Sequence, residues 1–134
     1  MAGLYIHVPF CKQKCTYCDF ASFPGQLSKA ESYFACLYRE ILGRSKQYPD
    51  KIIDTIYIGG GTPSVVDANF IAGAIRQVKK CFTVKKDAEI TIELNPGTVD
   101  KEKIKTYKSV GVNRFSIGLQ TGYDEQLKIG RAHV

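Results

Sequence analysis

Four short apolar segments alternate with amphipathic helical segments along this chain, and that order constrains the fold more than any other feature. The strand-like segments are residues 3–8, 54–58, 89–94 and 113–119. Helical stripes lie between them, with expected N-caps at Ser28, Asp67 and Asp100, and a fourth begins at 123–129. Parallel strands need crossover connections of a dozen or more residues, which these helices supply. The order therefore predicts an α/β fold of about four parallel strands with outer helices.

The two faces of the predicted strands differ in polarity. One face is apolar and suits packing under helices: Leu4, Ile6, Val8, Ile56, Ile58, Ile90, Ile92, Leu94, Phe115, Ile117 and Leu119. The other face carries Tyr5, His7, Tyr57, Gly59, Glu89, Thr91, Glu93, Arg114, Ser116, Gly118 and Gln120. A buried parallel sheet is normally apolar on both faces. The polar face therefore predicts a cavity wall, with an exposed sheet face as the alternative.

The residues able to bind a ligand or take part in chemistry gather at the carboxyl ends of these strands, where parallel α/β folds bind ligands. A cysteine loop follows the first strand, Gly59–Gly61 ends the second, Glu93 ends the third, and Gln120 follows the fourth. The glycines lack the lysine of a phosphate-binding loop, so their expected use is to offer backbone carbonyls and amides to a ligand. Glu93 has a simpler alternative, which is an ion pair with Arg114.

Three cysteines, Cys11, Cys15 and Cys18, stand within eight residues. A [4Fe–4S] cluster normally has four thiolate ligands, so three would leave one iron open to a small molecule. A structural zinc site completed by His7 is the alternative. A disulfide is disfavoured, because the chain has 5 Cys and no secretory signal precedes them. The other two, Cys36 and Cys81, fall on helical stripes and are expected to be inert.

Composition excludes some classes of function. The 134 residues, 44% of them hydrophobic, can bury a sizeable core but are few for a complete α/β barrel. The net charge of +6 comes from lysines spread over helical surfaces with few aromatic residues between them, which argues against nucleic-acid binding. No apolar run reaches membrane-spanning length and no signal peptide is evident, so a cytoplasmic location is expected.

The spacing Cys11-x₃-Cys15-x₂-Cys18, with Tyr17 before the last cysteine, resembles the signature of radical S-adenosylmethionine (SAM) enzymes. Further blocks resemble, in order, the branch that contains oxygen-independent coproporphyrinogen III oxidase and the HemW-type haem chaperones. These blocks are residues 5–11, 59–64, 93–96, 116–120 and 130–133. The resemblance covers essentially the whole chain and is more specific than the cysteines alone.

The resemblance implies that residues 1–134 are the N-terminal portion of a radical SAM core domain, a partial (β/α)₆ barrel like a TIM barrel. The remaining strands and a C-terminal region would be absent. It implies that Cys11, Cys15 and Cys18 ligate a [4Fe–4S] cluster. It also implies that SAM is contacted by Tyr5 and Tyr17 beside the cluster, by Gly60, Gly61 and Thr62 at its methionine end, and by Glu93, Gln120 and Arg131 at its polar groups.

The chemistry implied by the resemblance is one-electron reduction of SAM, which yields methionine and a 5′-deoxyadenosyl radical that abstracts hydrogen from carbon. The cofactor supplies that reactivity, and the protein supplies orientation and exclusion of solvent. The expected partners are SAM, haem or a porphyrinogen, an electron donor such as flavodoxin or ferredoxin, and a haem-acceptor protein.

Two features favour the chaperone branch over the oxidase. The oxidase pattern has a further cysteine two positions after the third cluster cysteine, where this chain has Phe20, and it has a longer segment before the first strand. Haem binding and transfer are therefore expected. Oxidative decarboxylation of coproporphyrinogen III is the first alternative, and a zinc-binding module without redox chemistry is the second.

Overall fold

The computed structural model describes residues 2–10 and 29–117, whose four strands form one parallel sheet. The strands are β1 (Ala2–Val8), β2 (Ile52–Gly60), β3 (Thr83–Leu94) and β4 (Arg114–Ile117), and they lie in the order β1-β2-β3-β4. Every neighbouring pair is parallel. The predicted α/β fold is confirmed. Strands that advance by one position in a single direction are typical of a barrel wall, because a doubly wound sheet reverses its order.

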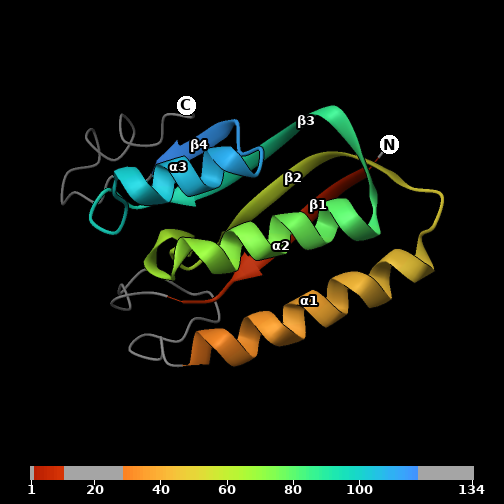
Figure 1. Ribbon diagram of the computed structural model, residues 1–134, viewed down its shortest axis with the longest axis horizontal. Helices are drawn as coiled ribbons and strands as arrows, with labels where there is room; N and C mark the ends of the chain where they lie inside the picture. The colour runs from red at the N-terminus through yellow and green to blue at the C-terminus, as the bar shows by residue number, and fades with distance from the viewer. Residues whose placement is uncertain (1, 11–28, 118–134) are drawn as a thin grey trace, which may run out of the picture.

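Within the described residues, three α-helices and one short 3₁₀ helix lie between the strands. They are α1 (Ala30–Gln47), η2 (Pro63–Val65), α2 (Ala68–Cys81) and α3 (Lys101–Ser109). Figure 1 shows α1, α2 and α3 side by side over one face of the sheet, with α2 between the other two. Two helix starts agree with the sequence: Asp67 accepts a hydrogen bond from the Asn69 amide at 2.9 Å, and Asp100 from the Lys103 amide at 2.8 Å.

The apolar face of the sheet packs under these helices, as predicted. Ile6, Val8, Ile56, Ile58, Ile90, Ile92 and Leu94 are buried there, and Leu4, Phe115 and Ile117 pack against them. The helices contribute side chains such as Phe34, Ile71 and Ile75, which are fully buried. One layer of helices therefore covers one face of the sheet, and the opposite face carries the polar residues. No helix within residues 2–10 and 29–117 is long and apolar enough to cross a membrane.

Several predicted boundaries differ from the structure. Strand β2, predicted as 54–58, is longer by two residues at each end. Helix α1 is described from Ala30, with Lys29 before it and no side-chain cap hydrogen bond from Lys29; the predicted cap at Ser28 lies outside the described residues and stays a prediction. Strand β3 begins at Thr83 rather than at residue 89. Its first residues pair with the start of β2, through Ile52 with Thr83, before the register shifts. The pairing of Thr83 and Val84 thus starts β3 early, and the charged residues Lys85, Lys86 and Asp87 fall at the register shift before the main pairing resumes at Glu89.

Candidate functional site

The polar face of the sheet brings side chains from three strands together at its carboxyl-terminal rim. His7 of β1 lies opposite Gly59 of β2, and Glu93 of β3 lies opposite Ser116 of β4. One step further from the rim, Tyr5 lies opposite Tyr57. Because the strands are parallel, their ends share this edge, and ligands bind at such an edge in related architectures. The rim is the candidate site.

Glu93 is the central acidic group of the rim. The Tyr57 hydroxyl donates a hydrogen bond to Glu93 Oε2 at 2.9 Å, and the Gly60 amide donates one to Oε1 at 2.9 Å. The predicted alternative, an ion pair of Glu93 with Arg114, is wrong: the Arg114 guanidinium lies 2.9 Å from Glu89 Oε1. Arg114 is opposite Thr91, midway between Glu89 and Glu93 in the register, and it pairs with Glu89, which lies further from the rim.

Two glycines allow this carboxylate to lie against the backbone of β2. A Cβ atom on Gly59 would come within 2.9 Å of both the Glu93 carboxyl carbon and the Tyr57 ring. Gly60 has φ of +119°, in the region that favours glycine, and a Cβ there would meet the His7 ring at 2.7 Å. These residues must therefore be glycine if Glu93 and His7 are to close over the strand end.

An aromatic row lies beside the carboxylate. The rings of Tyr5 and Tyr57 are stacked, with centroids 6.0 Å apart and planes at 18°. The Tyr5 hydroxyl is 3.1 Å from His7 Nδ1, and Tyr5 is 57% exposed at the mouth of the site. Partial burial, and next the negative charge of Glu93, raise the pKa of Tyr5. Partial burial also raises the pKa of Tyr57, as does its hydrogen bond to Glu93, so both phenols remain protonated donors at neutral pH.

The glycine loop uses its amides within the protein. The Gly60 amide binds Glu93, the Gly61 amide donates to the Val8 carbonyl at 2.9 Å, and the Thr62 amide donates to the Phe10 carbonyl at 2.6 Å. The amides of Gly60 and Gly61, which were expected to be available to a ligand, are thus bonded within the protein, and the role of Gly60, Gly61 and Thr62 in binding a ligand stays a prediction. The hydrogen bonds also join the loop to Phe10, the residue directly before Cys11.

A buried cluster of hydrogen-bonded polar groups, centred on Ser64 and not predicted from the sequence, supports the glycine loop. Ser64 is fully buried; its hydroxyl accepts a hydrogen bond from the Asn95 amide at 3.1 Å and bonds the Thr98 hydroxyl. The Lys103 ammonium donates to the carbonyls of Ser64 and Thr98. These hydrogen bonds join the loop after β2 to the turn after β3. Lys103 gave no usable signal in the sequence because α3 is rich in lysines that face solvent.

Six predicted site residues lie outside the described residues: Cys11, Cys15, Cys18, Tyr17, Gln120 and Arg131. Their roles stay predictions, as does the zinc alternative with His7. The structure brings Tyr5, Gly60 and Glu93 together, with Gly61 and Thr62 adjoining in the loop. Of the remaining cysteines, Cys81 packs against the core as predicted, whereas Cys36 is exposed on α1 rather than on its buried stripe; that both are inert stays a prediction.

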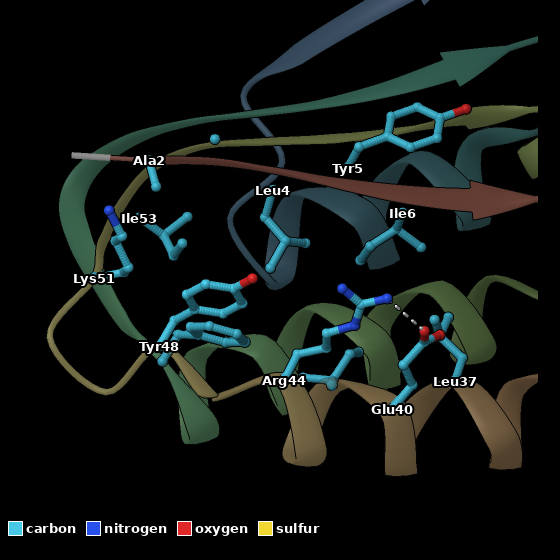
Figure 2. A pocket seen from close by; sticks show the side chains of 13 residues that line it. Ala2, Leu4, Tyr5, Ile6, Leu37, Glu40, Arg44, Tyr48, Lys51 and Ile53 are labelled. Carbon is cyan, nitrogen blue, oxygen red and sulfur yellow. Dashed lines mark hydrogen bonds and ion pairs between the residues drawn. The ribbon is translucent and has the colours of Figure 1, made fainter. Parts of the chain in front are cut away.

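A separate cavity of about 430 Å³ lies away from the rim, between β1 and α1. Figure 2 shows Leu4 and Ile53 on its sheet side and Tyr48 on its helix side, with the Arg44–Glu40 ion pair beside them. Ala2 and Lys51 mark this as the amino-terminal end of the sheet. Residues at that end of such folds generally serve stability. The cavity is therefore not the candidate site.

Comparison with known proteins places the chain in a family. The family model of the radical SAM superfamily matches residues 5–134. The chain is 40% identical to the haem chaperone HemW of Haemophilus influenzae, over 98% of this chain and 36% of that protein. It is also 40% identical to HemW of Escherichia coli, over 98% of this chain and 35% of that protein.

Two further similarities extend the comparison. The chain is 35% identical to the mitochondrial radical SAM domain-containing protein 1 of Danio rerio, over 98% of this chain and 30% of that protein. The structure of the Escherichia coli radical SAM enzyme coproporphyrinogen III oxidase (HemN) superposes with a TM-score of 0.83 at 29% identity, over 96% of this chain and 30% of that one. The chain thus spans about a third of the length of the relatives that it matches.

Proposed function

This chain belongs to the radical SAM superfamily, and on that premise we propose that residues 1–134 form the N-terminal portion of the radical SAM core domain of a haem chaperone. Membership implies a [4Fe–4S] cluster and SAM in general. The names of relatives that are 40% identical support the chaperone assignment. Because the chain spans about a third of their length, haem binding and transfer are proposed for the whole protein.

In this proposal Cys11, Cys15 and Cys18 hold the cluster. Three thiolates fit a cluster with one open iron, where SAM binds. The observation that carries the proposal is the junction at the rim. The glycine loop is hydrogen-bonded to Phe10, directly before the first cysteine, and the same loop holds Glu93. The residues proposed to hold the cluster therefore follow directly on the same hydrogen-bonded segment that holds the residues proposed to bind SAM.

The described residues fit SAM by their chemistry. SAM offers hydroxyl and ammonium donors and an adenine ring. Glu93 supplies acceptors and negative charge, the Tyr5 ring is exposed for contact, and the backbone carbonyls of 60–62 suit an ammonium group. We assign SAM binding to Tyr5, Tyr17, Gly60, Gly61, Thr62, Glu93, Gln120 and Arg131. When bound and reduced, the cofactors supply radical chemistry; the protein orients them and limits solvent.

The cluster assignment is tested by removing one thiol at a time. The protein is reconstituted anaerobically with iron and sulfide, and bound iron and sulfide are counted. Alanine at Cys11, Cys15 or Cys18 should abolish the cluster. Alanine at Cys36 or Cys81 is the matched control and should retain it, because these thiols lie on α1 and in the helix packing. Retention of a full cluster in all three test variants would refute the assignment.

A second function, oxidation of coproporphyrinogen III, is favoured by one observation, the superposition on HemN. Phe20 stands where the oxidase pattern has a cysteine, which supports the chaperone instead. The whole protein, with SAM and an electron donor such as flavodoxin or ferredoxin, should bind haem and pass it to an acceptor protein without consuming coproporphyrinogen III. Haem binding is followed by absorbance and porphyrin products by chromatography. Turnover of coproporphyrinogen III without haem binding would make the oxidase the better-supported function.

A further inference from the structure

Tyr57, one step from the rim on the polar face, is a residue to which the family resemblance assigns no role. It stands on β2, its side chain on the polar face of the sheet, and its hydroxyl donates to Glu93 Oε2 across to β3 at 2.9 Å. Its ring is stacked on Tyr5, so the phenol is supported on one side by β1 and bonded on the other to β3. The residue thus connects three strands at the point where Glu93 is held.

Tyr57 acts on Glu93 together with a second donor from the same strand. The Gly60 amide occupies Oε1 at 2.9 Å while the Tyr57 hydroxyl occupies Oε2. Two donors on different oxygens fix both the position and the rotation of a carboxylate. A carboxylate has about four acceptor sites, so two hydrogen bonds leave capacity for a ligand. The protein therefore holds the Glu93 side chain in place before any ligand binds, which lowers the entropic cost of ordering that side chain on binding.

Both donors are neutral, which preserves the negative charge of Glu93. Within residues 2–10 and 29–117 no ion pair involves Glu93, and Arg114 on the same face is bonded to Glu89. A lysine or arginine in place of Tyr57 would position the carboxylate equally well but would neutralise it. A neutral hydroxyl suits a site whose ligand is itself positively charged, as SAM is through its sulfonium and ammonium groups.

We infer that Tyr57 is a positioning residue for SAM binding, which holds the Glu93 carboxylate in place without neutralising it. The inference rests on the proposed function, because it needs Glu93 to contact SAM. It extends that function to a residue that does not itself touch the ligand. Its effect on affinity must therefore pass through Glu93 and must vanish when Glu93 is removed.

The test is a double-mutant cycle on the reconstituted protein, read by the dissociation constant for SAM in anaerobic titration calorimetry. The variants are Tyr57→Phe, Glu93→Ala and the double variant. Tyr57→Phe keeps the stacked ring and removes one hydrogen bond to a charged group, so SAM should bind about tenfold more weakly. In the double variant the affinity should equal that of Glu93→Ala alone, because the two residues act as a unit.

Tyr38→Phe is the matched control, since it removes a tyrosine hydrogen bond of 2.8 Å to the Phe70 carbonyl away from the rim. It should leave SAM affinity unchanged. If Glu93→Ala does not weaken SAM binding, the Glu93 assignment fails and the role of Tyr57 fails with it. If Glu93→Ala weakens binding but Tyr57→Phe does not, or if the two losses add in the double variant, the Tyr57 inference alone is overturned.

Discussion

Replacing Gly59 by alanine should impair SAM binding while leaving the fold nearly unchanged. Gly59 is not among the glycines with positive φ, so its backbone accepts alanine. The new Cβ would lie 2.9 Å from the Glu93 carboxyl carbon, where ordinary van der Waals contact begins at 3.4 Å. The carboxylate must therefore retreat by at least about 0.5 Å, as a flexible side chain can do at low cost.

That retreat breaks the arrangement that holds Glu93. The Gly60 amide and Oε1 are 2.9 Å apart, near the optimum for a hydrogen bond, and the shift takes them out of the usual range. A hydrogen bond to a charged group is worth about 1.5–3 kcal/mol, and the lower end applies because Glu93 is half-buried and water replaces the lost donor. A loss of about 1.4 kcal/mol corresponds to about tenfold weaker SAM binding.

Two glycines serve as controls in the same assays, which are calorimetric SAM titration and urea unfolding. Gly60→Ala should destabilise the fold itself, by about 1–3 kcal/mol, because φ of +119° is strained for alanine and the Val8 carbonyl lies 3.0 Å from the new Cβ. Gly43→Ala, in α1 with nothing within 4 Å, should stabilise by about 0.5–1 kcal/mol. If Gly59→Ala binds SAM as tightly as the wild type, the position of Glu93 does not govern SAM binding.

The remaining predictions concern three residues, Tyr107, Arg114 and Asp100, and are read by urea unfolding. The Tyr107 hydroxyl is buried without a hydrogen-bond partner among residues 2–10 and 29–117, so Tyr107→Phe should be neutral or stabilising by about 1 kcal/mol at pH 7, and a clear loss would show that a partner exists. Burial, and next Asp100 and Asp67, raise the pKa of Tyr107 to about 12. Because the unfolded phenol ionises near pH 10 and the folded one near 12, the wild type should lose stability across that window by roughly 2–3 kcal/mol more than Tyr107→Phe; equal slopes would contradict the burial. Arg114→Ala should cost less than about 1 kcal/mol and leave SAM affinity intact, since its pair with Glu89 is partly exposed; weakened SAM binding would restore a role for Arg114 at Glu93. Asp100→Ala should cost about 1 kcal/mol through loss of the α3 cap, and Asp100→Asn should restore most of it; no loss in the alanine variant would contradict the cap.

The parts of the fold that were predictable are those set by local pattern. Alternation along the strands identifies the buried face because side chains of a strand point to opposite sides, and Ile56 and Ile92 are buried as expected. Aspartate before an amphipathic segment identifies two helix starts, because its side chain can bond the amides of the first turn. The early start of β3 was not predictable, because it depends on the pairing of Thr83 and Val84 with β2, ahead of charged residues that fall at a register shift.

The details of the candidate site depend on register, which the sequence alone does not provide. Arg114 lies opposite Thr91, with Glu89 and Glu93 two residues to either side, so the sequence could not decide between them. Tyr57 also lies opposite Thr91, yet its hydroxyl reaches Glu93 two residues further along β3. Alternation placed Tyr57 and Glu93 on one face. Only the pairing of the strands shows that they are bonded.

The most direct test of the account is the electron paramagnetic resonance spectrum of the anaerobically reconstituted and reduced protein, recorded with and without SAM. The account predicts the signal of a reduced [4Fe–4S] cluster that changes when SAM is added, because three thiolates leave one iron open to the cosubstrate. A cluster signal that SAM leaves unchanged would contradict the open iron. A protein that binds one zinc ion and forms no cluster would contradict the proposed function as a whole.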